Sequence, residues 1–158
     1  MQFTIAFAAA LAALLPSTDA AALATGKAIV VNKCTTPVFL WAVGSSVGKK
    51  TVIPKDGRFT QAYSVDLKTG GMALKITTVD DGLFNKAPQT ILSYNLKSDQ
   101  VWYDLSDVSG DAFAGKKVKV SPSAATCEGI EWPKGVPPAT SQVKACSPAA
   151  DVTLTLCA

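Results

Sequence analysis

The chain has 158 residues, a formal net charge of +3 and no histidine. The lack of histidine excludes the usual base of a serine triad, imidazole metal ligands and the histidine-bound copper of oxidative polysaccharide enzymes. Arg58 is the single arginine and no run of Lys or Arg exceeds two residues, so we expect no nucleic-acid partner.

Residues 1–22 are predicted to be a secretory signal peptide. Residues 5–15 are apolar throughout, a stretch too short to span a bilayer, and the small residues that follow offer a cleavage site. An N-terminal helix packed on the core is the alternative. Cleavage would leave residues 23–158 as a single domain with one more net positive charge, because Asp19 is lost. We expect this domain to be secreted, extracellular and free of a membrane anchor.

The rest of the chain is predicted to form short strands. Its segments are rich in Val, Ile, Thr and aromatic residues and alternate apolar with polar positions, which is typical of half-buried strands. Turn residues separate them at intervals of roughly ten residues, a spacing that indicates an all-β antiparallel sandwich or barrel. The predicted strands span residues 27–32, 37–43, 50–53, 58–65, 72–79, 89–96, 100–106, 116–121 and 151–157.

Residues 121–150 break this alternation. They contain five prolines, and proline cannot donate a hydrogen bond within a sheet. We therefore expect a proline-rich loop that is clasped inside the domain and does not link it to a second one.

Four cysteines in a secreted chain indicate two disulfides, and four cysteines allow three connectivities. Cys127 and Cys146 bracket the proline-rich loop, so a bridge between them would hold a segment with little secondary structure. Cys34 and Cys157 would then join the first and last strand regions. Closing so long a loop removes on the order of 4 to 5 kcal/mol of denatured-state entropy. We favour this pairing over the other two.

Two motifs resemble the thaumatin-like proteins. Residues 28–45, AIVVNKCTTPVFLWAVGS, are similar to the opening of that family, where a strand, an Asn, a basic residue and a Cys precede a strand containing Trp. Residues 102–123, WYDLSDVSGDAFAGKKVKVSPS, are similar to its acidic strand and loop. The small fungal branch, the yeast-phase-specific or antigenic thaumatin-like proteins, is the most similar. The resemblance implies a thaumatin-like β-sandwich.

The resemblance also suggests glucan hydrolysis as an activity, since some larger thaumatin-like proteins bind or hydrolyse β-1,3-glucans at an acidic cleft. Asp104 matches the first aspartate of the family strand, but Ser109 stands where the second would fall. Glycosidases use two carboxylates roughly 5 to 9.5 Å apart. Residues three apart on a strand face opposite sides unless the chain bends. The catalytic candidates of a weak hydrolase are therefore Asp104 with Asp107, Asp111 or Glu128.

The candidate ligand-binding residues are Asp107, Asp111 and Trp132. The two aspartates concentrate negative charge at a strand end, where the loops of a sandwich meet partners. Trp132 lies in the proline-rich loop, where an exposed ring would stack on a sugar. A plain solvated turn and a calcium site are the alternative interpretations of the aspartates. Trp41 is expected in the core.

Two functions follow from these observations. The first is a secreted, non-catalytic cell-wall or surface-associated protein of a fungus, of the adhesin or antigen type, that binds β-glucan or a host surface protein. The second is a weak endo-β-1,3-glucanase. We expect a monomer without cofactor, metal, nucleic-acid or membrane partner.

Overall fold

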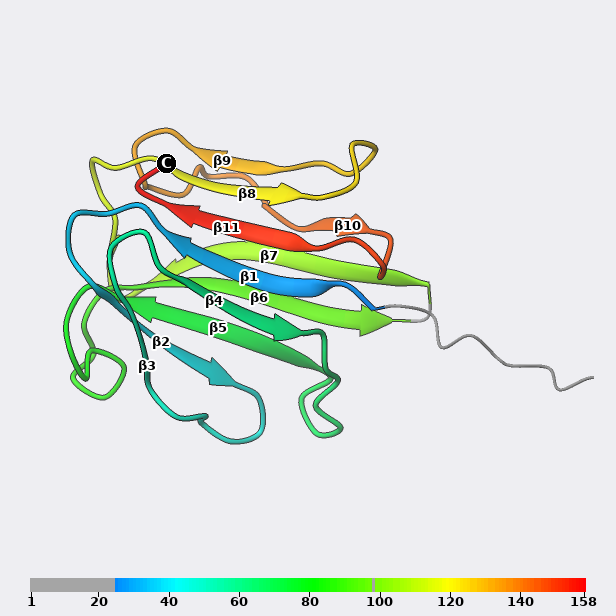
Figure 1. Cartoon of the computed structure of the whole chain (residues 1–158), viewed down its shortest axis with the longest axis horizontal. Helices are drawn as coiled ribbons and strands as arrows, with labels where there is room; N and C mark the ends of the chain where they lie inside the picture. The colour runs from blue at the N-terminus through cyan, green and yellow to red at the C-terminus, as the bar shows by residue number, and fades with distance from the viewer. Residues whose placement is uncertain (1–24, 98) are drawn as a thin grey trace, which may run out of the picture.

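The computed structural model describes residues 25–97 and 99–158, which form two β-sheets stacked face to face (Figure 1). All regular elements of these residues are strands, and no helix among them is long and apolar enough to cross a membrane. The predicted all-β sandwich is confirmed. The predicted signal peptide, residues 1–22, lies outside the described residues.

One sheet has five strands in the order β4-β1-β11-β8-β9. Its central neighbours β1 and β11 pair in parallel, whereas the other neighbours are antiparallel. The first and last strands of the chain therefore lie side by side, and the sandwich is antiparallel except at this pair. The strands are β1 (Lys27–Asn32), β4 (Arg58–Ala62), β8 (Val118–Pro122), β9 (Ile130–Trp132) and β11 (Val152–Leu156).

The other sheet has six strands in the order β10-β7-β6-β5-β2-β3, and all of its pairs are antiparallel. The two longest strands, β6 and β7, are neighbours in its middle part. The strands are β2 (Val38–Val43), β3 (Thr51–Ile53), β5 (Gly71–Thr77), β6 (Gln89–Lys97), β7 (Gln100–Val108) and β10 (Lys144–Cys146).

Each of the nine predicted segments contains a strand, but the prediction for residues 121–150 was incomplete. That region holds β9 and β10 in addition to its turns. Each of these strands has three residues, as the predicted β3 does, but unlike the Thr-Val-Ile of β3 neither consists of β-branched residues that would indicate a strand. Their pairing with β8 and β7 depends on neighbours far along the chain.

Alternation along the strands builds the core. In β11 the side chains of Val152, Leu154 and Leu156 are buried, whereas Thr153 and Thr155 are partly exposed on the outer face. The inner faces of both sheets contribute to one continuous apolar cluster. Burying such a side chain contributes about 1.5 to 3 kcal/mol, and a register slip of one residue would expose the whole inner row.

Both predicted disulfides are confirmed. Cys34 and Cys157 follow the parallel neighbours β1 and β11, so their Cα atoms lie 5.0 Å apart and the bridge joins two adjacent strand ends. Cys127 and Cys146 have Cα atoms 5.4 Å apart. Because Cys127 follows β8 and Cys146 ends β10, the second bridge connects the two sheets.

Candidate ligand-binding groove

The outer face of the six-stranded sheet carries a groove of about 440 Å³. It lies where β2 and β6 end and where β5 and β7 begin, so it occupies one end of the sheet (Figure 1). Its lining consists of Val43, Gly44, Thr69, Gly71, Met72, Ala73, Ser93, Tyr94, Asn95, Trp102, Tyr103, Asp104 and Val143.

The floor of the groove is a row of directly opposed residues from four strands. The register pairs Val43 with Ala73, Ala73 with Ser93, and Ser93 with Asp104. Opposed residues project from the same face of a sheet. The two middle positions hold small side chains, so the row is low in its centre and higher at Val43 and Asp104.

A second row lies next to the first, toward the end of the sheet. It runs from Gly71 to Asn95 to Trp102. A Cβ atom on Gly71 would lie 2.7 Å from the carbonyl oxygen of Tyr94, so only glycine fits here. The missing side chain keeps this row open and leaves the amide of Asn95 and the indole of Trp102 beside a hollow.

Trp102 and Val143 form an apolar rim. Their exposed fractions are 41% and 50%, which are high for large apolar side chains. A further hollow of about 340 Å³ adjoins this rim and is lined by Asn95, Lys97, Trp102 and Val143. The groove therefore continues past Trp102 along β6 and β7, and its shape suits an extended ligand.

Asp104 supplies a carboxyl group at the β7 side of the floor. Burial raises its pKa above the ordinary value, although a hydrogen bond from the Leu105 backbone opposes this effect. Among the described residues that line the groove, Asp104 is the only acid. The groove thus combines an exposed aromatic ring, one carboxyl group and a side-chain amide.

Asp66 lies outside the lining residues but holds the opposite rim in place, and it is not among the candidate residues of the sequence. Its carboxylate accepts hydrogen bonds from Ser45 N at 2.8 Å, Ser45 Oγ at 2.7 Å, and the backbone N–H groups of Lys68 and Thr69, each at 2.9 Å. These donors hold the pKa of Asp66 well below its usual range. Asp66 thereby ties the Gly44 segment to the Thr69 turn. Its only sequence signal is an Asp before a Lys-Thr-Gly-Gly turn, a common position for a carboxylate that bonds nearby backbone.

The structure separates Asp107 from Asp104, as their spacing predicted. Asp104 is opposite Ser93 in the groove, whereas Asp107 is opposite the buried Thr90 on the inner face. Thr90 Oγ1 donates to Asp107 Oδ1 at 2.6 Å, and Oδ2 is buried without a hydrogen-bond partner among the described residues. Burial raises the pKa of Asp107 to about 6, and the nearby Asp111 adds to this rise. Asp104 and Asp107 cannot share one substrate or one calcium ion.

Asp111 and Glu128 also lie outside the groove lining. Asp111 is exposed in the β7–β8 loop. Glu128 forms an ion pair with Lys144, which lowers the pKa of its carboxyl group. In the described part of the chain no three His, Cys, Asp or Glu side chains are placed to hold a metal ion.

The prediction that Trp132 meets a ligand was wrong. Trp132 is fully buried, because it ends β9 and alternates with the exposed Glu131. Its indole N–H donates to Gln142 Oε1 at 3.4 Å. The exposed tryptophan is Trp102, and the alternation of β7 carried a signal for it: Val101 and Tyr103 on either side are buried.

Comparisons with known proteins agree with this architecture. The family model of the Blastomyces yeast-phase-specific protein, Bys1, matches residues 15–158. An antigenic thaumatin-like protein of Arthroderma benhamiae is 35% identical over 131 residues, which cover 80% of this chain and 63% of that protein. The chain thus spans less than two thirds of the length of this curated relative.

Solved structures share the fold. The protein elicitor MoHrip2 from Magnaporthe oryzae has a TM-score of 0.70 and 25% identity, with 84% of this chain and 99% of that chain covered. The thaumatin-like xylanase inhibitor TLXI has a TM-score of 0.54 and 12% identity, with 83% and 99% covered. The second likeness concerns the fold alone. Together they confirm the predicted thaumatin-like sandwich.

Proposed function

Because the chain belongs to the Bys1 family of Blastomyces yeast-phase-specific proteins, we propose that it is an extracellular, non-catalytic surface protein that binds β-glucan in the groove of the six-stranded sheet. The observation that carries this proposal is the combination of an exposed Trp102 with Asp104 and Asn95 around a floor of small residues. Sugar rings present an apolar face that stacks on aromatic rings and hydroxyl groups that bond to carboxyl and amide groups.

The extended shape supports a polymer as the ligand. The groove and its adjoining hollow share Asn95, Trp102 and Val143, so a chain of several sugar units can lie along β6 and β7 with Trp102 beneath it. A single sugar would leave most of this surface uncovered. A host surface protein is the alternative partner for the same groove.

The positions of the acidic side chains favour glucan binding without hydrolysis. Hydrolysis by the usual route needs a second carboxyl group roughly 5 to 9.5 Å from the first. Asp104 is the single acid among the described lining residues, and Asp107 lies on the other face of β7.

The two disulfides support an extracellular location because they persist in oxidising compartments. The names of the antigenic relative and the elicitor support a surface role.

Retention on insoluble β-1,3-glucan tests the proposal. Trp102→Ala should reduce retention at least roughly tenfold, since the variant loses the stacking of the indole on the sugar and the apolar area that this contact buries. Asp104→Asn should reduce retention by a smaller factor, because an amide oxygen can still accept a hydrogen bond. The matched controls are Phe84→Ala, at an exposed ring outside the groove, and Asp111→Asn, at an exposed loop carboxyl group. Both controls should bind as the wild type does.

The same samples decide between binding and hydrolysis. Wild-type protein should release no reducing sugar from laminarin. Release that disappears in Asp104→Asn would establish a hydrolase instead. Equal retention of wild type and Trp102→Ala would overturn the groove as the binding site.

A further inference from the structure

A row of cationic side chains lies at the end of the five-stranded sheet, on the opposite sheet and at the opposite end of the molecule from the groove (Figure 1). At this end β4 and β8 begin and β1, β9 and β11 end. Backbone hydrogen bonds join the segments that flank these strands, each segment to the next one across the sheet. These run from Asp56 N to Asn32 O (2.8 Å), Lys33 N to Leu156 O (3.0 Å), Ala158 N to Lys117 O (2.9 Å) and Gly115 N to Lys134 O (2.8 Å).

We define the cationic row as Lys33, Lys55, Arg58, Lys116, Lys117, Lys119 and Lys134. The same strand ends and loops carry three acids, Asp56, Asp111 and Glu131. Seven cations against three acids leave four positive charges, which equals the net charge of residues 25–158, with 15 cations and 11 acids. The segments that carry the row therefore have a net charge of +4, and the remaining described charges balance one another.

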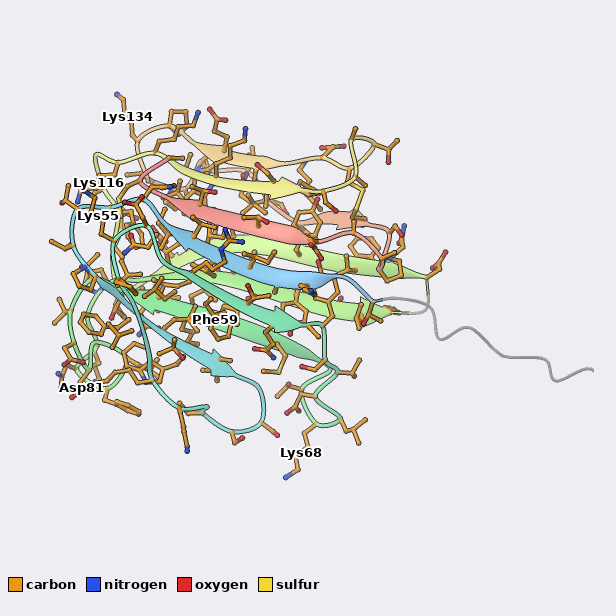
Figure 2. All side chains as sticks on the ribbon, in the orientation of Figure 1. Lys55, Phe59, Lys68, Asp81, Lys116 and Lys134 are labelled. Carbon is orange, nitrogen blue, oxygen red and sulfur yellow. A yellow bond between two sulfur atoms is a disulfide. The ribbon has the colours of Figure 1, made fainter. Side chains whose placement is uncertain are left out.

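Part of this charge is free to meet a partner. Lys33 pairs with Asp56 at 3.0 Å and Lys117 pairs with Glu131 at 2.9 Å. Lys55, Lys116 and Lys134 are exposed and form no ion pair with any described residue. Figure 2 shows these three side chains reaching outward at the same end of the molecule.

The backbone beneath the row is held firmly. The side chain of Asn32 is buried, and its Nδ2 donates to the carbonyl oxygens of Thr36 (2.9 Å) and Ile53 (3.0 Å), while its Oδ1 accepts from Cys34 N at 2.9 Å. The Cys34–Cys157 bridge lies directly alongside. The cations are therefore spaced by the sheet itself, and a ligand need not order the loops in order to bind.

The geometry suits a linear polyanion. The row runs across the ends of five strands. Four strand spacings of about 4.8 Å therefore place its outer lysines, Lys55 and Lys134, roughly 19 Å apart. A bilayer is a poor match, because the segments that carry the row have no exposed aromatic ring to anchor them: in the described chain the exposed rings are Trp102, in β7 beside the groove, and Phe84, in the β5–β6 loop. Nucleic acid is also disfavoured, since the row contains one arginine and no exposed ring on which a base could stack.

We propose that the cationic row binds a linear anionic polysaccharide, one that carries sulfate or uronate groups, independently of the β-glucan groove. The lysine ammonium groups contact successive anionic groups along the polymer and displace their counterions. Such binding is strongly salt-dependent.

Heparin is a suitable probe, and two triple variants of the whole, disulfide-bonded chain form a matched pair. The first, K55Q/K116Q/K134Q, removes three exposed lysines of the row that form no ion pair with any described residue. The second, K27Q/K49Q/K68Q, removes three exposed lysines outside the row, such as Lys68 at the lower margin of Figure 2, away from Lys55, Lys116 and Lys134. Both variants lose the same net charge. We expect the first to raise the heparin Kd at least roughly tenfold and to lower the salt slope of binding by about 2 to 3. The second should leave both values near those of the wild type.

Each other outcome overturns the proposal. Equal weakening by both variants would mean attraction to the overall charge, and no weakening by the first would mean a site elsewhere. A wild-type chain that fails to bind heparin at 0.1 M salt, or that prefers phosphatidylserine vesicles or single-stranded DNA, would contradict an anionic polysaccharide as the ligand. Melting temperatures of both variants should match the wild type, because all six lysines are exposed.

Discussion

At the scale of single residues, two aspartates of this protein show how the surroundings decide the protonation of a carboxyl group. Asp66 accepts four hydrogen bonds at the rim of the groove, and they lower its pKa. Asp107 accepts one bond from Thr90 and has an unpaired buried oxygen, so burial raises its pKa. Asp66 is stabilised as an anion, whereas Asp107 is stabilised as an acid.

Asp107 should make the fold less stable as the pH rises. Its folded pKa of about 6 lies above its ordinary value of 3.8, so between these values the folded state binds a proton that the unfolded state has released. The free energy of unfolding should therefore fall from about pH 4 to pH 6 and then level off. Because the group is half exposed, solvent screening limits the effect to about 1 kcal/mol.

Denaturant titrations of Asp107→Asn from pH 4 to 8 measure this effect. The variant cannot ionise at this position, so its stability should vary less with pH and exceed that of the wild type at pH 7. Asp99→Asn, at an exposed carboxyl group, serves as the control and should retain the wild-type pH dependence. A variant that is less stable than the wild type at pH 7 would show that the ionised carboxylate stabilises the fold.

At the scale of the elements, the two disulfides act on different parts of the sandwich. Cys34–Cys157 closes a separation of 123 residues between neighbouring strand ends of one sheet. Cys127–Cys146 closes 19 residues and connects the sheets. The first constrains almost the whole unfolded chain, whereas the second mainly positions β9 and β10 and their turns.

Removing the longer bridge should cost more stability. The chain-entropy model predicts that Cys34→Ser with Cys157→Ser lowers the free energy of unfolding by about 1 to 2 kcal/mol more than Cys127→Ser with Cys146→Ser. Guanidinium unfolding of the two double variants measures the difference. A greater loss in the second pair would mean that the contact between the sheets outweighs the length of the loop.

At the scale of the whole molecule, the two proposed binding surfaces are well separated. The groove lies on the outer face of the six-stranded sheet, and the cationic row lies at the far end of the other sheet. A strand of six residues, such as β1, already spans about 20 Å. The Debye length at physiological salt is about 8 Å, so charge bound at the row should hardly affect the groove.

Saturating heparin should therefore leave retention on β-glucan unchanged. A pull-down with both polymers measures this directly, and labelled heparin should appear on the glucan together with the protein. The variant K55Q/K116Q/K134Q should still bind glucan but carry little heparin with it. Competition between the two polymers would place both in one site and contradict the separation.

Local patterns were sufficient to predict much of this protein. The alternation of apolar and polar residues located nine of the eleven described strands, because burial of one face has a period of two along any strand. The positions of the cysteines at the first and last strands led to the observed pairing. The same alternation placed Asp104 and Asp107 on opposite faces of β7.

The functional surfaces depended on strand order, which no local pattern contains. Trp132 entered the core because distant strands cover one side of the short β9, whereas the outward position of Trp102 also follows from the alternation along β7. The groove exists because Ala73 and Ser93, twenty residues apart, are opposed across two strands. The lysines of the cationic row form no long run in the sequence. They lie together because five strands from distant parts of the chain begin or end at the same end of one sheet. Contacts between residues far apart along the chain are set by how the sheets pair and pack, so only the tertiary structure could bring these side chains together.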